Sequence, residues 1–566
     1  MKKIIWIFIY CLLAQWSTAQ VAPKWAEKGK KAVFSIITYD KDGKMKATGN
    51  GFYIDATGTA LSDYTLFEGA SRAVIITANG KELPVENIGG VNSMYDVIKF
   101  QTSMEKKQPW LTIATQPSKV GETIYLLPYS TQKSSTLQTG KIVAVDSIGN
   151  NSFYYTLEIA TNDKTVSCPI VNANGEVIGM IQKSVSDDKK EGYAIGASFG
   201  ASLSISALSI NDKSLQNIQI KKALPNNEEQ ALVYLYMAST TMSVDEYTTL
   251  LEDFIAQYPQ NYEGYIRRAT LLMSGDDASK YPFAEKDLQK AIDVSTHKAE
   301  ARHSVAKNIY AYALSLNGKE GYENWNYENA LNIIRQAIKE DAQPIYIQLE
   351  GNILFAQQKY EEAYQSYEKV NQSEMASAST FYTAAKTKQL IEGTDFNEVI
   401  ALMDSAVARF IQPYTSEAAP YIFERGEMKA MAGKYKEAVA DYNAFYDALH
   451  GSVTATFYFQ REQAEMQCRM YQQAINDINK AVELEPSNAE FWLEKGAVHT
   501  RFNQMAEATE ALMKAISLDD KLGAAYRMLG YCQIKEKKNT EACENFMKAK
   551  ELGDTVVDQL IEKYCK

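Results

Sequence analysis

The stretch GNGFYIDATGTALSDYTLFEGA, residues 49–70, carries the clearest fold signal in the chain. Its short runs of β-branched and aromatic residues alternate with Gly, Asn and Asp, which favour tight turns. The same texture continues in four further runs: AVFSIIT (32–38), AVIIT (73–77), ETIYLL (122–127) and GEVIGMI (175–181). Short strands separated by turn residues predict an all-β barrel or sandwich.

The pattern changes near residue 215, where Gly and Pro become rare and apolar residues recur at helical spacing. A repeat with a period of 34 residues is visible in this part: Trp492, Gly496, Ala508, Leu512 and Ala515 recur as Tyr526, Gly530, Ala542, Phe546 and Ala549. The period and the residue types resemble tetratricopeptide repeats, in which hairpins of two helices stack into a solenoid.

Length and charge narrow the class of protein. At 566 residues the chain is several times longer than a usual domain, so at least two folding units are expected. The formal net charge of −11 and the absence of a basic run argue against nucleic acid as a partner, because binding a polyanion needs clustered cationic surface.

The first residues have the form of a secretory signal. Two lysines precede an apolar run from Ile4 to Ala14, and small residues follow up to Ala19, where cleavage is expected. The run is too short to span a bilayer, and no other segment is apolar enough. The mature chain is therefore predicted to be soluble and exported, most simply to a bacterial periplasm.

The cysteines suggest neither a disulfide framework nor a zinc site. Five remain after the expected cleavage, thinly scattered, at Cys168, Cys468, Cys532, Cys543 and Cys565. None of the spacings is typical of a metal site. Cys532 and Cys543 could face each other across a hairpin or be two separate buried residues, and the sequence leaves this open. No metal, other cofactor or stapling disulfide is expected.

From about Ala32 to Leu203 the chain resembles the trypsin-like domain of the HtrA/Deg family of exported serine proteases. Four ordered matches carry the resemblance: GNGFYIDATGTALS (49–62), SMYDVIKF (93–100), CPIVNANGEVIGM (168–180) and GYAIG (192–196). Together they cover roughly a third of the sequence. The resemblance implies a double β-barrel that carries a triad of Ser, His and Asp in its active members.

The resemblance places the family's triad on Thr65, Asp96 and Val166. Thr65 stands where the histidine belongs, Asp96 retains the acid, and Val166 replaces the nucleophile within KTVSCP (164–169), where both glycines of the oxyanion turn are also replaced. A hydroxyl is too weak a nucleophile at neutral pH without an imidazole to accept its proton. These positions predict a degenerate site, in which Asp96 accepts hydrogen bonds from nearby backbone.

A shift of the alignment offers Ser167 as a hydroxyl nucleophile or Cys168 as a thiol, but supplies no base. The four histidines all lie in the helical repeats: His297, His303, His450 and His499. A lysine base such as Lys164 or Lys99 would need burial to lower its pKa, and both stand beside polar neighbours. For Cys168 the alternative is a small buried residue.

Together the two resemblances predict a multidomain β plus α protein, a trypsin-like double β-barrel followed by an all-α superhelical solenoid of tetratricopeptide repeats. The predicted order is a signal peptide (1–19), the β-barrel domain (25–211), a linker (212–227), about nine helical hairpins (228–554) and a capping helix (555–566).

The first helix of each hairpin is expected to line a concave face that binds peptide segments or partner proteins. The family's clamp of Lys, Asn and Arg for a C-terminal carboxylate is not visible in the sequence. Candidate groove contacts are Arg267, Arg268, Asn352, Arg527 and Tyr531, with solvated helix-face residues as the alternative.

The function predicted from these features is a non-enzymatic scaffold or adaptor that binds a protein partner, with an envelope complex as one option for its setting. The competing class is a serine or cysteine endopeptidase with a non-standard dyad at Ser167 or Cys168, whose repeats recruit substrate. A third class is a chaperone-like holdase. The sequence does not choose between scaffold and holdase, and it names neither the partner, the oligomeric state nor an association with the inner or outer membrane.

Overall fold

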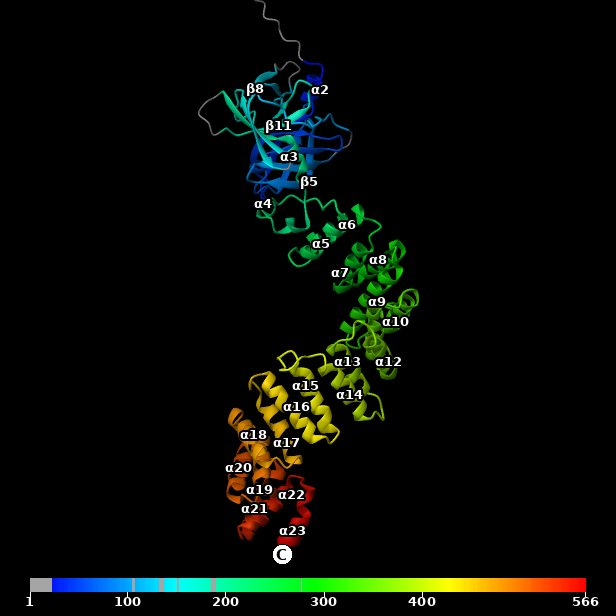
Figure 1. The fold of residues 1–566 in the computed structure, drawn as a ribbon, viewed down its shortest axis with the longest axis vertical. Helices are drawn as coiled ribbons and strands as arrows, with labels where there is room; N and C mark the ends of the chain where they lie inside the picture. Colours follow the sequence, from blue (N-terminus) through cyan, green and yellow to red (C-terminus); the bar gives the residue numbers. More distant parts are fainter. Residues whose placement is uncertain are drawn as a thin grey trace, which may run out of the picture. The chain divides into compact units, whose positions relative to one another are not determined.

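A computed structural model describes residues 23–103, 107–131, 137–149, 152–184, 190–275 and 277–565, drawn as a ribbon in Figure 1. The predicted signal peptide, residues 1–19, lies outside the described residues. The chain divides into two compact units between Leu271 and Leu272. The first unit contains the β-rich part and the first helices, and the second contains the remaining helices.

Six antiparallel strands close the first barrel in the order β1-β2-β3-β6-β5-β4. They are β1 (Val33–Tyr39), β2 (Met45–Tyr53), β3 (Thr59–Ser62), β4 (Arg72–Ile76), β5 (Glu82–Asn92) and β6 (Val97–Thr102). Alternate residues of β1, such as Phe34 and Ile36, point into the core because side chains of a strand alternate between its faces. Gly51 allows the close approach of β2, since an added Cβ would lie 2.7 Å from the Phe34 ring.

Six further strands close a second barrel in the order β10-β11-β12-β9-β8-β7. They are β7 (Thr123–Leu126), β8 (Gln138–Gly149), β9 (Ser152–Glu158), β10 (Pro169–Val171), β11 (Val177–Gln182) and β12 (Glu191–Gly196). Ile124, Ile142, Leu157 and Ile181 are among the side chains that fill its core. The two closed six-stranded barrels confirm the fold class predicted for the β-rich part.

The segment after the second barrel folds back onto the first barrel. It contains the short helices α3 (Ala197–Ser202) and α4 (Lys213–Gln216), and its backbone then bonds to the barrel. The N–H of Ile88 donates to the carbonyl of Lys221, and the N–H of Ala223 donates to the carbonyl of Ile88, both at 2.8 Å. The predicted linker, residues 212–227, therefore runs along the barrel surface; the predicted domain boundaries themselves stay a prediction.

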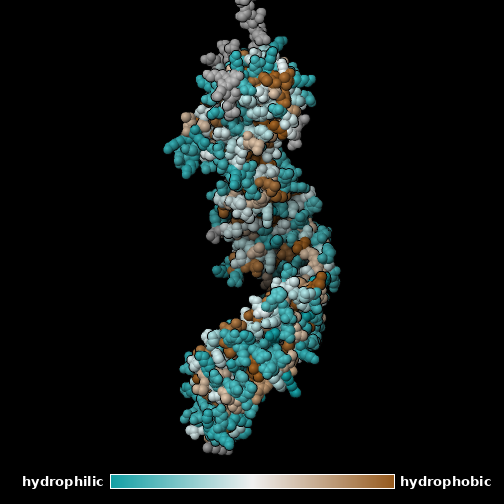
Figure 2. Space-filling view, turned by 60° about the vertical axis from the view of Figure 1, so that its left-hand side comes forward, coloured by the Kyte–Doolittle hydropathy of each residue, from teal (hydrophilic) through white to brown (hydrophobic). Residues whose placement is uncertain are grey.

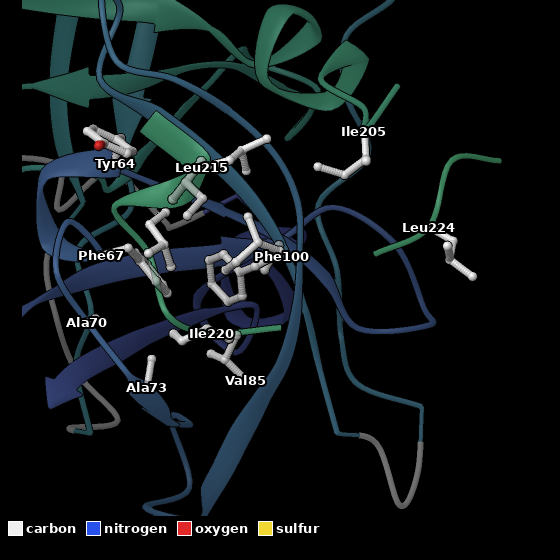
Figure 3. Packing of buried hydrophobic residues seen from close by; sticks show 14 of the residues in the cluster. Tyr64, Phe67, Ala70, Ala73, Val85, Phe100, Ile205, Leu215, Ile220 and Leu224 are labelled. Carbon is white, nitrogen blue, oxygen red and sulfur yellow. The ribbon is translucent and has the colours of Figure 1, made fainter. Parts of the chain in front are cut away.

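One hydrophobic cluster continues from the first barrel through this segment into helices α5 (Glu228–Ala238) and α6 (Val244–Gln257). Figure 3 shows Leu215 and Ile220 of the segment close to Phe67 and Phe100 of the barrel. Leu235 of α5 and Phe254 of α6 are fully buried members of the same cluster. The first helices of the array thus share a core with the barrel.

From Glu228 onward the described residues form helices joined by turns. The later helices are α7 (Tyr262–Ser274), α8 (Tyr281–Val294), α9 (Lys298–Ser315), α10 (Tyr327–Glu340), α11 (Pro344–Ala356), α12 (Tyr360–Asn371), α13 (Ala378–Gln389), α14 (Phe396–Val407), α15 (Ala419–Met431), α16 (Tyr435–Ala448), α17 (Ala455–Gln467), α18 (Tyr471–Leu484), α19 (Ala489–Arg501), α20 (Met505–Leu518), α21 (Gly523–Lys535), α22 (Asn539–Glu551) and α23 (Asp558–Tyr564). In the second unit consecutive helices pack as hairpins, from α9 with α10 to α21 with α22. The predicted all-α repeat array is confirmed.

Small residues let the two helices of a hairpin approach closely, as the repeat pattern predicts. A Cβ added to Gly496 would lie 2.6 Å from Leu512, and one added to Gly530 would lie 2.7 Å from the Phe546 ring. Glycine at these places therefore sets the distance between the paired helices.

The end of the array corrects the prediction that no disulfide staples the chain. Cys543 of α22 is bonded to Cys565, which follows the last helix, α23. Cys532 is a buried free thiol, so it does not pair with Cys543. Cysteine spacing could not reveal this bond, because it depends on α23 folding back against α22.

The surface is dominated by hydrophilic residues, with apolar patches between them on the face drawn in Figure 2. This agrees with a chain in which 23% of the residues are charged. Among the described residues, no helix combines the length and the apolar character needed to cross a membrane.

Candidate functional site

Two of the predicted triad positions meet between β3 and β6 of the first barrel. Thr65 stands in a single turn of 3-10 helix, Tyr64–Leu66, and Asp96 directly precedes β6. The backbone N–H and the hydroxyl of Thr65 both donate to Asp96 Oδ1, at 2.8 and 2.9 Å. A hydroxyl thus occupies the place beside the acid that the family resemblance assigns to an imidazole.

The turn that carries Val166 is held by an amide from the other barrel. Asn50 of β2 donates through Nδ2 to the carbonyl oxygens of Lys164 and Val166, at 3.0 and 2.9 Å. Because Asn50 belongs to the first barrel and the turn leads into β10 of the second, these bonds join the two barrels. Val166 is half-buried and offers no nucleophilic group.

Ser167 follows in the same turn and is fully buried, with a φ of 63°. Its hydroxyl donates to the carboxylate of Asp63, which directly follows β3. Ser62 contacts the same carboxylate oxygen as Ser167, with its Oγ 3.2 Å from Asp63 Oδ1 and 2.6 Å from the carbonyl oxygen of Asn50. The hydroxyl of Ser167 is therefore engaged inside the protein and has no exposed surface.

Asp63 and Asn50 were missed by sequence reasoning. Burial raises the pKa of the Asp63 carboxyl to about 6, the hydrogen bond from Ser167 opposes the rise, and the charge of Asp96 adds to it. An acidic residue directly after a buried strand was the available signal for Asp63. Its partner Ser167 lies 104 residues away in the chain, so no local pattern pairs the two.

Cys168 is a fully buried thiol in the core of the second barrel. Burial raises the pKa of the Cys168 thiol to about 12, so the residue is a neutral thiol near pH 7. A thiol in this state is a poor nucleophile, because the thiolate is the reactive form. Burial thus lowers the reactivity of both fallback nucleophiles, Ser167 and Cys168, in the folded barrel.

The surroundings of Lys99 are less polar than its neighbours in the sequence suggest. Its side chain is partly buried, and desolvation lowers the pKa of the Lys99 ammonium. The ammonium donates to the carbonyl of Ala201 in α3 at 2.9 Å. Lys164 is exposed.

Within the described ranges, no group of three or more His, Cys, Asp and Glu side chains could hold a metal ion.

The predicted groove contacts are distributed over several helices, and most of them bond within the chain. Asn352 of α11 accepts from the hydroxyl of Tyr367 at 2.8 Å, and Arg527 of α21 pairs with Asp554 at 2.7 Å. Tyr531, also on α21, is half-buried and its ring lies 5.3 Å from the ammonium of Lys535.

The arginine pair lies on α7 in the first unit. Arg267 lies 3.4 Å from the carboxylate of Glu263, one turn earlier on the same helix. Arg267 and Arg268 are both half-buried. Arg267 and Arg268 belong to the first compact unit, whereas Asn352, Arg527 and Tyr531 belong to the second.

Residues 49–180 match the family described as trypsin-like peptidase domain. The crystal structure of an inactive mutant form of Rv3671c from M. tuberculosis aligns with a TM-score of 0.27 and 19% identity, over 33% of this chain and 91% of that chain. The active form of the Rv3671c protease aligns with a TM-score of 0.29 and 18% identity, over 37% and 88%.

Residues 489–522 match the family described as tetratricopeptide repeat. Sperm-associated antigen 1 of Rattus norvegicus is 32% identical over 117 residues, which are 21% of this chain and 13% of that protein. Small glutamine-rich tetratricopeptide repeat-containing protein 2 of Saccharomyces cerevisiae is 27% identical over 95 residues, 17% of this chain and 28% of that protein. The chain thus spans less than a third of the length of either relative.

Proposed function

We propose that this chain, a trypsin-like domain joined to a tetratricopeptide array, is an exported binding scaffold or adaptor without peptidase activity. The helical array holds a protein or peptide partner, because stacked helix faces suit such partners. The barrel domain serves as a binding and capping module rather than as a catalyst. The signal peptide predicted over residues 1–19 directs the mature chain to an exported compartment, a bacterial periplasm.

The observation that carries this proposal is the absence of an imidazole base from the barrel. The barrel domain contains no histidine, since the first histidine of the chain is His297. A serine or cysteine peptidase needs a group that accepts a proton from the nucleophile and returns it to the leaving amine. Thr65 cannot do this near pH 7, because its hydroxyl does not titrate there.

The geometry of the fallback residues supports the same proposal. Asp63 is a carboxyl next to a hydroxyl, but Ser167 and this carboxyl are both buried where a substrate carbonyl does not reach them. Cys168 lies in the barrel core as a neutral thiol. A peptidase built on either residue would have to open the barrel before it could react.

A peptidase assay tests the enzymatic half. The purified mature chain is incubated with casein and with a fluorogenic peptide, beside the variants Ser167→Ala and Cys168→Ala. We expect the same background signal from all three proteins. Turnover by the wild-type chain that either substitution abolishes would refute the proposal and support the competing endopeptidase.

A purification from native envelopes tests the binding half. We expect the tagged mature chain to retain a partner at fixed stoichiometry, and the double substitution Arg527→Ala and Tyr531→Ala on α21 probes whether this helix contributes. Recovery of many chains without fixed stoichiometry, together with suppression of client aggregation, would replace the scaffold with a holdase.

A further inference from the structure

The eighth residue of the first helix marks the place where the hairpins close most tightly. In four hairpins it is a glycine whose added Cβ would lie 2.6–3.0 Å from a side chain of the second helix: Gly351 in α11, Gly426 in α15, Gly496 in α19 and Gly530 in α21. In α17 the same position holds Glu462. A carboxyl therefore stands where the four hairpins with glycine have no side chain.

Glu462 is fully buried, and the groups around it would not balance the negative charge of an ionised carboxylate. Gln463 donates to Glu462 Oε2 at 2.8 Å, while Oε1 has no hydrogen-bond partner among the described residues. The charged groups that act on it are Glu465 on its own helix and both Glu494 and Arg501 on α19. An ionised Glu462 would thus face two acids and one cation.

Glu465, one turn later on α17, is buried and also incompletely satisfied. Its Oε2 has no hydrogen-bond partner in the described part of the chain, and its Oε1 lies 3.9 Å from Arg461 Nε. Arg461 is already held by Asp477 of α18 through bonds of 2.6 and 2.9 Å. One guanidinium is therefore shared between two carboxylates, which leaves Glu462 without a cation of its own on α17 or α18.

We propose that the hairpin α17/α18 is a proton-controlled joint of the helical array, closed against α19 while Glu462 is protonated and loosened when Glu462 ionises. A neutral carboxyl is far cheaper to bury than a carboxylate without a partner. Ile478 of α18 follows Glu462 by 16 residues, at the position where the four hairpins with glycine carry Tyr, Leu or Phe, and it offers the carboxylate no hydrogen bond. Water reaches the charge only if the helices separate.

The titration of the two carboxyls supports this joint. Burial raises the pKa of Glu462 to about 8, with the charge of Glu494 adding to the rise, and burial with the charge of Asp477 raises the pKa of Glu465 to about 8. In an unfolded chain both groups ionise near their ordinary value of about 4.3. The folded hairpin therefore loses stability as the pH rises between these values, and the loss is complete above about pH 8.

Hydrogen exchange of the full chain, followed by mass spectrometry at about pH 6 and about pH 9 and corrected for the intrinsic rate, tests the joint. We expect exchange in α17, α18 and α19 to be at least about tenfold faster at the higher pH. The hairpin α15/α16, with Gly426 at the equivalent position, should show no such change. The variant Glu462→Gln should show a clearly smaller increase in exchange between the two pH values, because only Glu465 still titrates there, whereas Glu490→Gln, exposed on α19, should behave as the wild type.

Equal corrected exchange of the wild-type α17–α19 region at both pH values would overturn the proposal, as would an unchanged pH response in Glu462→Gln. A second readout does not depend on how the variant packs. The infrared spectrum of the wild-type chain near neutral pH should contain the carbonyl stretch of a buried protonated carboxyl that Glu462→Gln lacks. If no such difference appears, Glu462 is ionised in the folded chain and the joint does not exist.

Discussion

At the scale of single residues, the site that resembles a protease site is occupied by structural hydrogen bonds. The hydroxyl of Thr65 donates to Asp96, and the hydroxyl of Ser167 donates to Asp63. Asn50 holds the turn that contains Val166. Each group that could take part in acyl transfer thus contributes to joining the two barrels or to the packing of their turns.

The buried carboxyl of Asp63 should make the stability of the barrel depend on pH. Its pKa of about 6 in the folded chain lies above its ordinary value of about 3.9, so stability is greatest at low pH and is lost as the pH rises through this window. We expect Asp63→Asn to remove this loss, which is at most about 3 kcal/mol. Calorimetric unfolding at about pH 4 and about pH 7 measures it.

Asp163, an exposed residue four positions before Ser167, provides the matched control for this experiment. Asp163→Asn should leave the pH dependence of barrel unfolding as it is in the wild type. If Asp63→Asn and Asp163→Asn give the same pH dependence, the carboxyl of Asp63 is not the group that titrates.

Sequence reasoning named Thr65 and Asp96 because Asp96 belongs to a stretch that resembles a known family and Thr65 follows such a stretch by three residues. It did not find the contact between Asp63 and Ser167, or the burial of Glu462. Such contacts depend on which distant side chains meet in the folded core, and the local pattern of a single chain does not contain that information.

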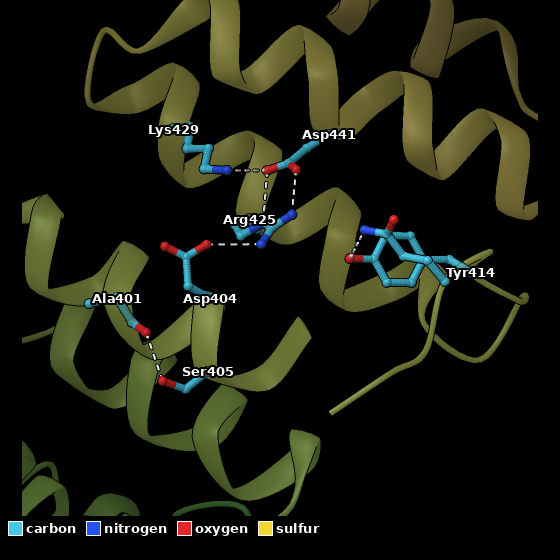
Figure 4. A network of polar contacts seen from close by, with 8 residues as sticks. Ala401, Asp404, Ser405, Tyr414, Arg425, Lys429 and Asp441 are labelled. Atoms are coloured by element: carbon cyan, nitrogen blue, oxygen red, sulfur yellow. Dashed lines mark hydrogen bonds and ion pairs between the residues drawn. The ribbon is translucent and has the colours of Figure 1, made fainter. Parts of the chain in front are cut away.

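At the scale of helices, a repeated ion pair joins the two helices of a hairpin. Arg425 of α15 binds Asp441 of α16 through bonds of 2.9 and 2.6 Å and also binds Asp404 of α14 at 2.9 Å, as Figure 4 shows. In the next hairpin Arg461 repeats the bond to the second helix through Asp477, again 16 residues later. An arginine on the first helix thus ties together helices that the apolar repeat pattern already brings into contact.

Removal of the Arg461 side chain should destabilise the array strongly. Arg461→Met leaves Asp477 and Glu465 buried without their shared cation, which costs about 3–5 kcal/mol. Denaturant unfolding followed by circular dichroism measures the loss. Lys480→Met, which removes an exposed pair with Glu483, should cost less than about 1 kcal/mol. Equal losses of stability in the two variants would show that the buried ion pair contributes no more to stability than the exposed one.

The disulfide should hold the last helix in place. α23 has seven residues, too few to be stable as an isolated helix. The Cys543–Cys565 bond closes a segment with a separation of 22 residues, so Cys565→Ser should cost about 3 kcal/mol locally. Hydrogen exchange in α22 and α23 should accelerate, whereas Cys532→Ser should leave α23 protected. Unchanged protection of α23 in Cys565→Ser would contradict this role.

The helices were predictable to the extent that their positions follow a period. The recurrence of residues at a spacing of 34 placed the hairpins that contain Gly496 and Gly530, because close packing demands small residues there. The disulfide and the ion pairs were not predictable. The disulfide joins two cysteines whose spacing is typical neither of a metal site nor of a disulfide framework. The ion pairs were missed because the sequence does not tell whether a charged residue on a helix is solvated or buried.

At the scale of the molecule, the first compact unit is a barrel domain completed by helices. The cluster that contains Phe100 of the barrel also contains Leu215 of the connecting segment and Phe254 of α6. The barrel and the first helices of the array are therefore expected to unfold together, and the barrel closes the N-terminal end of the helices that it contacts.

A substitution in α6 should accordingly weaken the barrel. Phe254→Ala removes a fully buried ring and should cost about 3–5 kcal/mol. Hydrogen exchange should show lost protection in β4 and β5 as well as in α5 and α6. Val244→Ala, at an exposed position on the same helix, is the control. Loss of protection confined to the helices would mean that the two parts unfold independently.

The central claim is that the barrel domain has no reactive nucleophile, and chemical labelling tests it most directly. The folded chain and the urea-unfolded chain are treated with a fluorophosphonate and with iodoacetamide, and labelled peptides are mapped by mass spectrometry. The account predicts no label on Ser167 in either state, and label on Cys168 only after unfolding. Stoichiometric labelling of Ser167 or Cys168 in the folded chain would contradict it.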